Sequence, residues 1–524
     1  MEDQIREQER VLARLKRTRN SLLNISKLPP EVLGDIFRRN VTLKDDFEGL
    51  EEGSHNFLLV CHHWSEVASR TPEIWSFWGN TPKDWERWYC RSGSAPLDLV
   101  LDRETGSPPS DTLYGVLQNR ATRDTIRRIH LKGGDSGFLS TIIRRLTAPD
   151  EGVRSSSVAS FLLWDWVYPS VDVSGFFSRY RFPKLRQLSL RDCTISSWDC
   201  LMSRTAVLTT LDLNFTDSSP TPSTSQLLSI LASNPTLQKV TLYKRAVPRD
   251  HDDKSSSRVQ LHHLEELELT GDLQHVMRLL HRLDHPRNMN LLKLTLHNCD
   301  ITDVSRIIGP YLRDHFQRRN RPQNGLYLST YSGYGDSIRG DCISFDLGDA
   351  GGIDLSTLTW SSKSRFIIIG IMLNTSRRRD ILGSAVLDLV AHIPQGDVVH
   401  FRRYGPPIAM ENTHSQFPNL RTLFYSSASL LNIFPNPSLV GEDKISPSLE
   451  SVVLDYMFAD DGNWTPLTTF LSRRASSGNR LDTLVVNGSS HMCPGVVEDI
   501  RGMVRELRTN PLDPLCPSVI RIEP

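Results

Sequence analysis

The segment from residue 28 to residue 78 contains the strongest helical pattern of the chain. It reads LPPEVLGDIF over residues 28–37 and FLLVCHHWSEVASRTPEIWSFW over residues 57–78. Its apolar residues recur at spacings of three and four, which predicts three helices with an apolar side each. Pro29 and Pro30 suit the first turn of the first helix, and Thr71 with Pro72 opens the third. The apolar positions are Val32, Leu33, Ile36 and Phe37, then Phe57, Val60, Cys61, Trp64, Val67 and Ala68, then Ile74, Trp75 and Trp78.

A unit of this size keeps much of its surface exposed, because small domains bury a smaller fraction of the chain than large ones do. Its many large apolar residues therefore indicate that part of the surface is covered by something else. Two interpretations remain open from the pattern alone. The helices form a cap on a larger core, or they present a docking face to another protein.

The order of these residues resembles an F-box. The family pattern is Leu-Pro-x-Glu, Ile-Phe, Val-Cys-x-x-Trp and Pro-x-x-Trp, and here it falls on residues 28–31, 36–37, 60–64 and 72–75. The segment 41–56 departs from the family, because it is longer than the usual link between the first two helices and carries five acidic residues. The chain as a whole is similar to fungal-type F-box substrate receptors with a leucine-rich-repeat-like region.

The resemblance implies a partner and a contact surface. An F-box docks on a Skp-family adaptor, which tethers it to a cullin ubiquitin ligase. The residues that the resemblance assigns to adaptor binding are Leu28, Pro29, Pro30, Val32, Leu33, Ile36, Phe37, Leu59, Val60, Cys61, Trp64, Val67, Pro72 and Trp75.

Residues 1–23 predict an amphipathic N-terminal helix. Its apolar residues are Ile5, Val11, Leu12, Leu15, Leu22 and Leu23. A coiled-coil dimer through residues 2–23 is one interpretation. The stripe is short, which favours instead a helix that packs on the F-box helices or frays in solution.

A further helix is predicted over residues 81–94, connecting the F-box at 24–80 to the rest of the chain. Five of the ten tryptophans lie between residues 64 and 88. Such a cluster is able to stack on bases or sugars, but a helical core is the favoured interpretation.

A Leu-x-x-Leu-x-Leu pattern recurs along the chain. Copies begin at residues 126, 158, 185, 208, 237, 264 and 291, and again at 420, 449 and 481. Residues 185–195 and 291–301 complete the leucine-rich-repeat signature, with Cys193 and Cys299 in its Asn/Cys position. One repeat cannot bury its apolar face alone, so the pattern predicts stacked strands with return segments between them. Helical returns are expected over residues 224–232 and 274–283.

The sequence thus predicts an α/β protein, in which a three-helix F-box precedes an irregular leucine-rich-repeat solenoid at 95–510 with a parallel sheet on its concave face. A half-buried strand is expected over residues 95–102. Between about residues 320 and 400 the pattern loses its phase, around a Gly-rich stretch at 332–352. Residues 511–524 are expected to form a Pro-rich cap or tail.

Composition argues against several classes of function. The 524 residues include 61 Lys and Arg and 61 Asp and Glu, so no overall field attracts nucleic acid or an anionic membrane. No apolar run reaches the length of a membrane span, and the N-terminus is charged where a signal peptide is apolar. The eight cysteines contain no Cys-x-x-Cys pair, which argues against a disulfide framework or a zinc site. We expect a protein of the cytoplasm or the nucleus.

No motif predicts catalysis, a cofactor or a metal. The segment 134–137 resembles the sequence around a serine-protease nucleophile but lacks the residues that follow it there, so a turn is favoured. The pairs at 62–63 and 262–263 are histidines without a second ligand pair at a suitable spacing. The Gly-rich segment 348–352 lacks the Lys-Ser/Thr end of a phosphate loop, and the arginines at 377–379 suit a solvated edge.

Side chains that alternate with the inward leucines are predicted on the open face of the sheet, because successive strand residues point to opposite sides. That face mixes neutral, basic, aromatic and acidic residues, which suits a protein partner better than a polyanion. The candidate target-binding residues are Gln187, Arg191, Asp212, Asn214, Lys239, Tyr243, Glu266, Glu268, Lys293 and His297.

The expected function is that of a non-catalytic substrate receptor of a Skp-cullin-F-box (SCF) ubiquitin ligase, which holds a protein target through the solenoid for ubiquitin-dependent degradation. Two alternatives stay open. One is an F-box protein that acts outside a ligase, and the other is a plain leucine-rich interaction scaffold that binds no adaptor. An enzyme is not expected, since no nucleophile, acid–base pair or metal constellation stands out.

Overall fold

The computed structural model describes the chain as two compact units, formed by residues 1–239 with 248–255 and by residues 240–247 with 256–524. The division falls inside the predicted repeat array. The acidic segment 42–55, the arginines at 377–379 and the C-terminal segment 511–524 lie outside the described residues. Those described are 1–41, 56–78, 85–102, 111–133, 136–147, 154–165, 170–202, 207–215, 219–250, 258–286, 289–299, 304–317, 325–335, 338–348, 353–354, 359–360, 366–373, 391–392, 398, 400–404, 417–426, 448–455, 464–487, 492 and 494–510.

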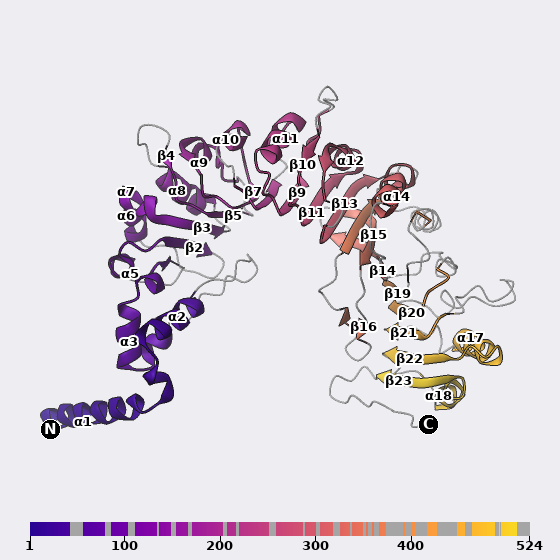
Figure 1. The fold of residues 1–524 in the computed structure, drawn as a ribbon, viewed down its shortest axis with the longest axis horizontal. Coiled ribbons are helices and arrows are strands. Elements are labelled where there is room, and N and C mark those ends of the chain that lie inside the picture. The colour runs from indigo at the N-terminus through magenta and orange to yellow at the C-terminus, as the bar shows by residue number, and fades with distance from the viewer. Residues whose placement is uncertain are drawn as a thin grey trace. The chain divides into compact units, whose positions relative to one another are not determined.

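The first unit begins with helices (Figure 1). Pro30 and Pro72 are the first residues of α2 and α4, where the missing N–H of proline leaves no helical hydrogen bond unmade. Thr71 precedes α4 as predicted, but its hydroxyl donates to Val67 O at 2.8 Å instead of capping the helix. Helices are found at all three predicted places, but the second begins only at His62, because residues 56–59 form a separate 3-10 turn and Cys61 is extended. The bounds are α1 Glu2–Ser21, η1 Asn24–Lys27, α2 Pro30–Val41, η3 Asn56–Leu59, α3 His62–Ser69, α4 Pro72–Trp75 and α5 Trp85–Ser92.

These helices share an aromatic core. The rings of Trp75 and Trp88 meet edge to face with their centroids 5.3 Å apart, and those of Phe37 and Trp64 lie 5.1 Å apart. Trp64, Trp75 and Trp88 therefore serve the helical core, as predicted. The buried members of the cluster are Leu33, Phe37, Val41, Val67, Ala68, Ile74, Trp75, Phe77 and Val100.

A parallel sheet follows in the first unit, and its strand order is the order of the chain. In hydrogen-bonded order the strands are β1 Phe77–Trp78, β2 Leu97–Asp102, β3 Ile126–Gly133, β5 Ser160–Asp165, β7 Gln187–Cys193 and β8 Thr210–Phe215. The helices that connect them lie along one face of the sheet (Figure 1). They are α6 Asp111–Gln118, α7 Arg120–Thr125, α8 Ser136–Leu146, α9 Ser174–Arg179, α10 Asp199–Met202 and α11 Thr224–Ala232. The short strands β4 Arg154–Ser155 and β6 Tyr180–Arg181 pair separately.

The leucine pattern explains this arrangement. Leu188 and Leu190 on β7 are at most 1% exposed, and they stand in register with Leu211 and Leu213 on β8. Rows of leucine therefore run across the strands beneath the helices, which is how stacked repeats bury a face that one repeat cannot bury alone. Cys193, in the signature position, is also fully buried.

The predicted return helix at 224–232 is confirmed as α11. Ser223 and Gln226 form a reciprocal capping box at its beginning. Beyond its end, the buried Asn234 donates through Nδ2 to Ile230 O at 2.8 Å and accepts through Oδ1 from Leu208 N at 3.2 Å. These hydrogen bonds tie the helix end to the preceding repeat.

The second unit also contains mostly parallel strands. In hydrogen-bonded order they are β9 Lys239–Lys244, β11 Glu266–Asp272, β13 Leu291–Cys299, β18 Phe366–Leu373, β15 Ile338–Gly348, β14 Gly325–Gly335, β19 His400–Tyr404, β20 Thr422–Ser426, β21 Ser451–Asp455, β22 Leu481–Asn487 and β23 Val504–Asn510. The helices are α12 Leu273–Arg282, the π-helical η4 Val304–Ile308, α14 Gly309–Gln317, α17 Thr465–Ser476 and α18 Pro494–Arg501. The pair β10 Val259–Gln260 and β12 Leu283–Asp284 stands apart.

The middle of this unit departs from the prediction of a purely parallel sheet. β14 and β15 form an antiparallel hairpin that is inserted between β18 and β19, so β13 pairs with β18 instead of the next long strand in the chain. The two-residue strands β16 Ile353–Asp354 and β17 Thr359–Trp360 form a separate antiparallel pair. Inward and outward side chains alternate along both strands of a hairpin, and a short turn joins the strands without a return helix. The spacing of a strand followed by a return helix is therefore absent here, so the leucine pattern loses its phase. The chain is mixed α/β with a large parallel sheet.

Candidate functional site

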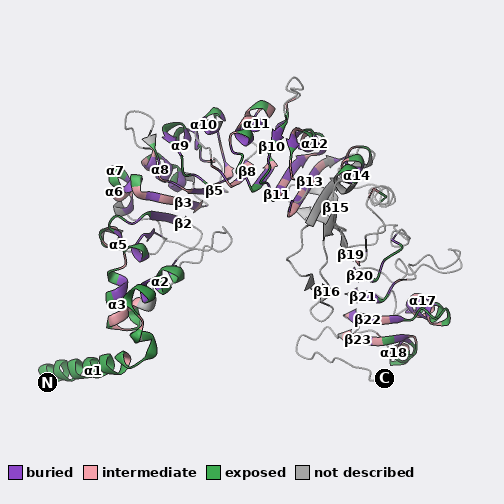
Figure 2. Ribbon diagram, in the orientation of Figure 1, coloured by how far each residue is buried: buried purple, intermediate pink, exposed green. Residues whose placement is uncertain are grey.

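Helix α2 has two apolar sides. Leu33 and Phe37 point into the helical core, whereas Val32 and Ile36 are 45% and 44% exposed. The spacing of four places Val32 and Ile36 one turn apart on the same side of the helix. Pro29, just before the helix, is exposed as well. α2 therefore holds the core with one side and offers apolar area to solvent with the other (Figure 2).

A second exposed apolar segment lies at η3. Leu59 is 85% and Val60 55% exposed, and they lead into α3, which packs against α2. We refer to Pro29, Val32, Ile36, Leu59 and Val60 as the exposed apolar set. Contiguous exposed apolar side chains are typical of binding surfaces, which makes this set the candidate contact surface of the N-terminal helices.

The structure divides the residues that the F-box resemblance assigns to adaptor binding. Buried in the helical core are Leu33, Phe37, Val67 and Trp75. Half-buried are Leu28, Cys61 and Trp64, and exposed are Pro29, Pro30, Val32, Ile36, Leu59, Val60 and Pro72. In this conformation the core residues are able to act on a partner only indirectly, by holding the helices in place.

The sheet of the first unit carries aligned rows of side chains on the face opposite its connecting helices α6 to α11, and we call it the polar face. Helix α2 lies beside the start of this face, at Asp98 and Arg128. The first row is Asp98, Arg128, Ser160, Gln187 and Thr210; the second is Val100, His130, Leu162, Ser189 and Asp212; the third is Asp102, Lys132, Trp164, Arg191 and Asn214. These residues alternate with the inward leucines along each strand. Four of the five target-binding residues predicted in this unit, Gln187, Arg191, Asp212 and Asn214, therefore share one face.

Asp212 is a buried acceptor on the polar face. It is 6% exposed, and its Oδ2 accepts from Ser189 Oγ and from Arg191 Nε, each at 2.8 Å. A buried carboxylate needs such donors, because leaving water without them is costly. Its Oδ1 has no hydrogen-bond partner among the described residues. This oxygen is itself buried, so it is not accessible to another molecule in this conformation.

Trp164 lies between two cations in the third row. Lys132 Nζ is 5.2 Å and Arg191 Cζ is 5.6 Å from the centroid of its ring, and its Nε1 donates to Asp192 Oδ2 at 3.2 Å. Lys132 also pairs with Asp102 at 3.4 Å. A half-buried tryptophan held between basic side chains is typical of the anchor residues at protein interfaces.

His130 is enclosed in the second row and is 2% exposed. Ser160 Oγ donates to Gln187 Oε1 at 2.9 Å and therefore accepts from His130 Nε2 at 2.9 Å. Burial, with a contribution from the nearby Arg128 guanidinium, lowers the pKa of His130 from 6.5 to about 3. The ring is consequently neutral in the folded protein at neutral pH.

Acid is expected to destabilise the first unit through His130. Because the folded-state pKa is depressed, only the unfolded chain takes up this proton as the pH falls below 6.5, so stability is lost progressively toward about pH 3. The variant His130→Gln keeps an amide donor and removes the titration. Denaturant unfolding compared at about pH 7.5 and about pH 5 should show a smaller acid-induced loss for the variant than for the wild type. Equal losses in the two proteins would contradict this assignment.

In the second unit, Glu268 joins two other predicted residues. Tyr243 Oη donates to Glu268 Oε1 at 2.7 Å, and Lys293 Nζ forms an ion pair with the same oxygen. His297 lies farther along β13, where burial and the nearby Lys244 lower its pKa. Tyr243, Glu268 and Lys293 thus form one cluster.

Two further predicted residues lie at other positions of the strands. Glu266 on β11 is half-buried, and Lys239 is exposed at the start of β9. The ten candidates are divided between the two units, since Lys239 belongs to the first and Glu266 to the second.

Sequence reasoning missed the contribution of the earlier strands to the polar face. His130 and Lys132 on β3 and Ser160 and Trp164 on β5 occupy the same rows as the predicted residues. The signal was available, because the copies that begin at residues 126 and 158 obey the same alternation. Contacts between strands, such as the hydrogen bond from Trp164 on β5 to Asp192 on β7, depend on the register of the strands. The sequence alone does not predict that register.

A basic pocket of about 490 Å³ opens in the first unit beside α2 and the first strands. Four arginines face two carboxylates in its lining, which leaves a formal charge of +2 and favours an anionic group. Arg127 is held there by Asp98, whose two oxygens accept from its Nε and Nη2 at 3.0 and 2.6 Å. The lining residues are Arg38, Arg39, Val41, Glu73, Ser76, Phe77, Pro96, Asp98, Arg127 and Arg128.

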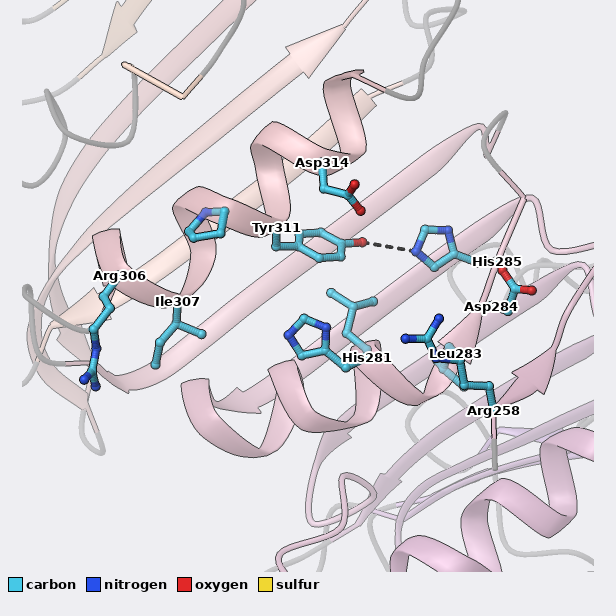
Figure 3. A pocket seen from close by; sticks show the side chains of 11 residues that line it. Arg258, His281, Leu283, Asp284, His285, Arg306, Ile307, Tyr311 and Asp314 are labelled. Atoms are coloured by element: carbon cyan, nitrogen blue, oxygen red, sulfur yellow. Dashed lines mark hydrogen bonds between the residues drawn. The ribbon is translucent and has the colours of Figure 1, made fainter. Parts of the chain in front are cut away.

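A second pocket, of about 500 Å³, lies in the second unit between α12, β12 and α14 (Figure 3). The hydroxyl of Tyr311 points to His285, with 3.1 Å between Oη and Nε2, and the ring of His281 meets that of Tyr311 edge to face. Two arginines balance two aspartates in the lining, so the pocket carries no net charge that would select an ion. Its residues are Arg258, Leu280, His281, Leu283, Asp284, His285, Arg306, Ile307, Pro310, Tyr311 and Asp314.

The histidine pairs noted in the sequence lie apart from these sites. His262 and His263 are both exposed, and His62 is exposed on α3. Among the described residues, no three His, Cys, Asp or Glu side chains are grouped so that they could hold a metal ion. None of the described helices combines the length and the apolar character that crossing a lipid bilayer requires.

The fold and the surfaces define a mixed α/β chain with an exposed apolar set on its N-terminal helices and a polar sheet face. Neither a protein-family model nor any curated protein matches the sequence. Function is therefore argued from the surfaces themselves.

Proposed function

We propose that the protein is a substrate receptor of an SCF ubiquitin ligase, with an N-terminal F-box and a leucine-rich-repeat solenoid. The observation that carries the proposal is the two-sided helix α2, in which Leu33 and Phe37 build the core while Val32 and Ile36 stay open beside the exposed Pro29. The apolar positions of the F-box pattern are thus divided between a scaffold and an accessible surface. A docking module requires that division.

The leucine rows support the solenoid part of the proposal. Copies of the repeat give parallel strands in chain order in the first unit, with helices along one face. The middle of the second unit is irregular, because the β14–β15 hairpin interrupts the array there. The solenoid is therefore proposed as a diverged one.

The polar face is the proposed surface for the target. Trp164 between Lys132 and Arg191 supplies an aromatic anchor, and the half-buried Gln187 and Asn214 supply polar groups on the same face. The receptor would contribute proximity, since holding the target beside a ubiquitin-loaded enzyme replaces a bimolecular encounter with a local one. No side chain of this chain needs to react.

Capture of the adaptor is the direct test. The purified full chain is incubated with a recombinant Skp-family adaptor, with and without the matching cullin, and the complexes are separated by size-exclusion chromatography. We expect adaptor and cullin to elute together with the chain. Elution with the adaptor alone would favour an F-box protein that acts outside a ligase. Failure to retain either would overturn the proposal and leave a plain interaction scaffold.

A further inference from the structure

Helix α1 is exposed along its whole length (Figure 2). None of its residues is buried, and Ile5, Leu12, Leu15 and Leu22 are 50%, 51%, 64% and 71% exposed. The prediction that this helix packs on the neighbouring helices is therefore wrong. Its apolar stripe is a surface without a cover among the described residues.

We propose that α1 pairs in antiparallel orientation with α1 of a second copy of the chain. Ile5 and Leu12 are seven residues apart, as are Leu15 and Leu22, so the four residues fill two alternating seam positions of a heptad. In an antiparallel pair whose facing residue numbers sum to 27, Ile5 meets Leu22 and Leu12 meets Leu15. Each of these four apolar residues thus faces an apolar residue of the other copy.

The polar residues of the seam select the same orientation. In this register Gln8 faces Arg19 of the second copy, which can donate to its amide oxygen. A parallel pair in register would instead place Arg19 directly against Arg19. Like charges at a seam position are unfavourable, so the parallel arrangement is disfavoured.

Charges beside the seam also match. The first half of the helix holds the carboxylates Glu2, Asp3, Glu7 and Glu9 with the cations Arg6 and Arg10, so it is acidic on balance, whereas the second half holds Arg14, Lys16, Arg17 and Arg19 and no carboxylate. An antiparallel pair sets each acidic half against a basic half. In particular, Glu9 flanks the seam opposite Lys16 of the second copy, and this contact occurs twice by symmetry.

Neither Glu9 nor Lys16 is committed elsewhere in the part of the chain that the structure describes. The ion pair within α1 joins Arg10 to Glu7 at 3.3 Å. Glu9 and Lys16 are therefore able to pair between copies without breaking a contact within one copy. The exposed apolar set lies on α2 and η3, so this association does not depend on adaptor binding.

The interface is short, with one helix of 20 residues from each copy. Short helix pairs bury little area, so the dimer is expected to dissociate on dilution. Sedimentation velocity of the full chain over a range of concentrations should therefore show a monomer–dimer equilibrium.

Charge reversal tests the register. Glu9→Lys places lysine against Lys16 of the second copy, and Lys16→Glu places glutamate against Glu9, so each variant alone should dimerise on the order of tenfold more weakly. In an equimolar mixture, a Glu9→Lys chain is able to pair with a Lys16→Glu chain. Both flanking contacts of that mixed pair then join a lysine to a glutamate, so the mixture should recover the wild-type affinity. Arg17→Glu is the matched control, because residue 17 lies away from the seam and its reversal should change nothing.

Each outcome decides the proposal. The antiparallel pair is supported if each single variant dimerises more weakly than the wild type, if the mixture regains the wild-type affinity, and if Arg17→Glu dimerises as the wild type does. A wild-type chain that stays monomeric at every concentration, or a mixture that dimerises no better than the single variants, would overturn it. Since α1 buries no residue, these substitutions leave the folded core unaltered, and unchanged thermal unfolding of each variant verifies that.

Discussion

The double variant Val32→Glu with Ile36→Glu is expected to abolish capture of a Skp-family adaptor while leaving the thermal unfolding of the chain unchanged. Both side chains are nearly half exposed, so the new carboxylates remain solvated in the free protein. In a complex they would be buried without partners, which is strongly unfavourable. Truncating a central anchor costs about 2 kcal/mol or more, and two buried charges cost more than that, so affinity should fall at least about a hundredfold.

The control for this variant lies on the same helix. Arg38→Glu also adds a carboxylate to α2, at an exposed position on a different side, where Arg38 pairs with Asp35 at 3.0 Å. It should capture the adaptor about as well as the wild type, since exposed ion pairs contribute little. Full capture by the double variant would show that the open side of α2 is not the docking surface.

Trp75→Ala is expected to lower the stability of the N-terminal helices by about 3–5 kcal/mol. Trp75 is 2% exposed, its Nε1 donates to Ala68 O at 2.7 Å, and the Arg91 guanidinium lies 4.3 Å from its ring centroid. The substitution leaves a cavity in the helical core and removes the indole hydrogen bond to Ala68 O, which keeps its bond from Thr71 N at 3.2 Å. Adaptor capture should fall with it, because the buried Trp75 holds the helices that carry the exposed apolar set.

Hydrogen exchange distinguishes this loss from a lost contact. In the Trp75→Ala chain, amides of α2, α3 and α4 should lose protection while those of β20 to β22 keep theirs, because those strands belong to the other unit. Trp164→Ala is the matched control, since the half-buried Trp164 lies on the sheet and its loss should leave the helices protected. Wild-type protection of α2 to α4 in Trp75→Ala would refute the structural role.

The sequence predicted the regular parts of the fold because local rules dictate them. Pro30 and Pro72 begin helices for a reason that holds within one turn, and the leucine triplets place β7, β8 and β11 wherever a copy occurs. The same rule failed between β13 and β19, where the neighbour of a strand is chosen by pairing across the sheet. Leucine spacing within one strand does not predict which other strand pairs with it.

The candidate site was predictable to the same extent. Alternation along the strands placed Gln187, Arg191, Asp212 and Asn214 on one face, but it could not show that Arg191 and Ser189 both donate to Asp212. Nor could spacing separate Val32 from Leu33, which lie side by side in the motif and differ only in which neighbours the folded chain gives them.

The inserted hairpin of the second unit affects how the chain is assembled during synthesis. Leu291 of β13 pairs with Phe366, 75 residues later, whereas Glu266 of β11 pairs with Leu291, only 25 residues later. Closing a loop three times as long costs about 1 kcal/mol more. Until the ribosome has made those 75 residues, β13 ends the growing sheet with an open edge that invites pairing with other chains. Growth of the sheet by one strand per repeat therefore stops at β13, and this edge is where a nascent chain is most exposed to misassembly.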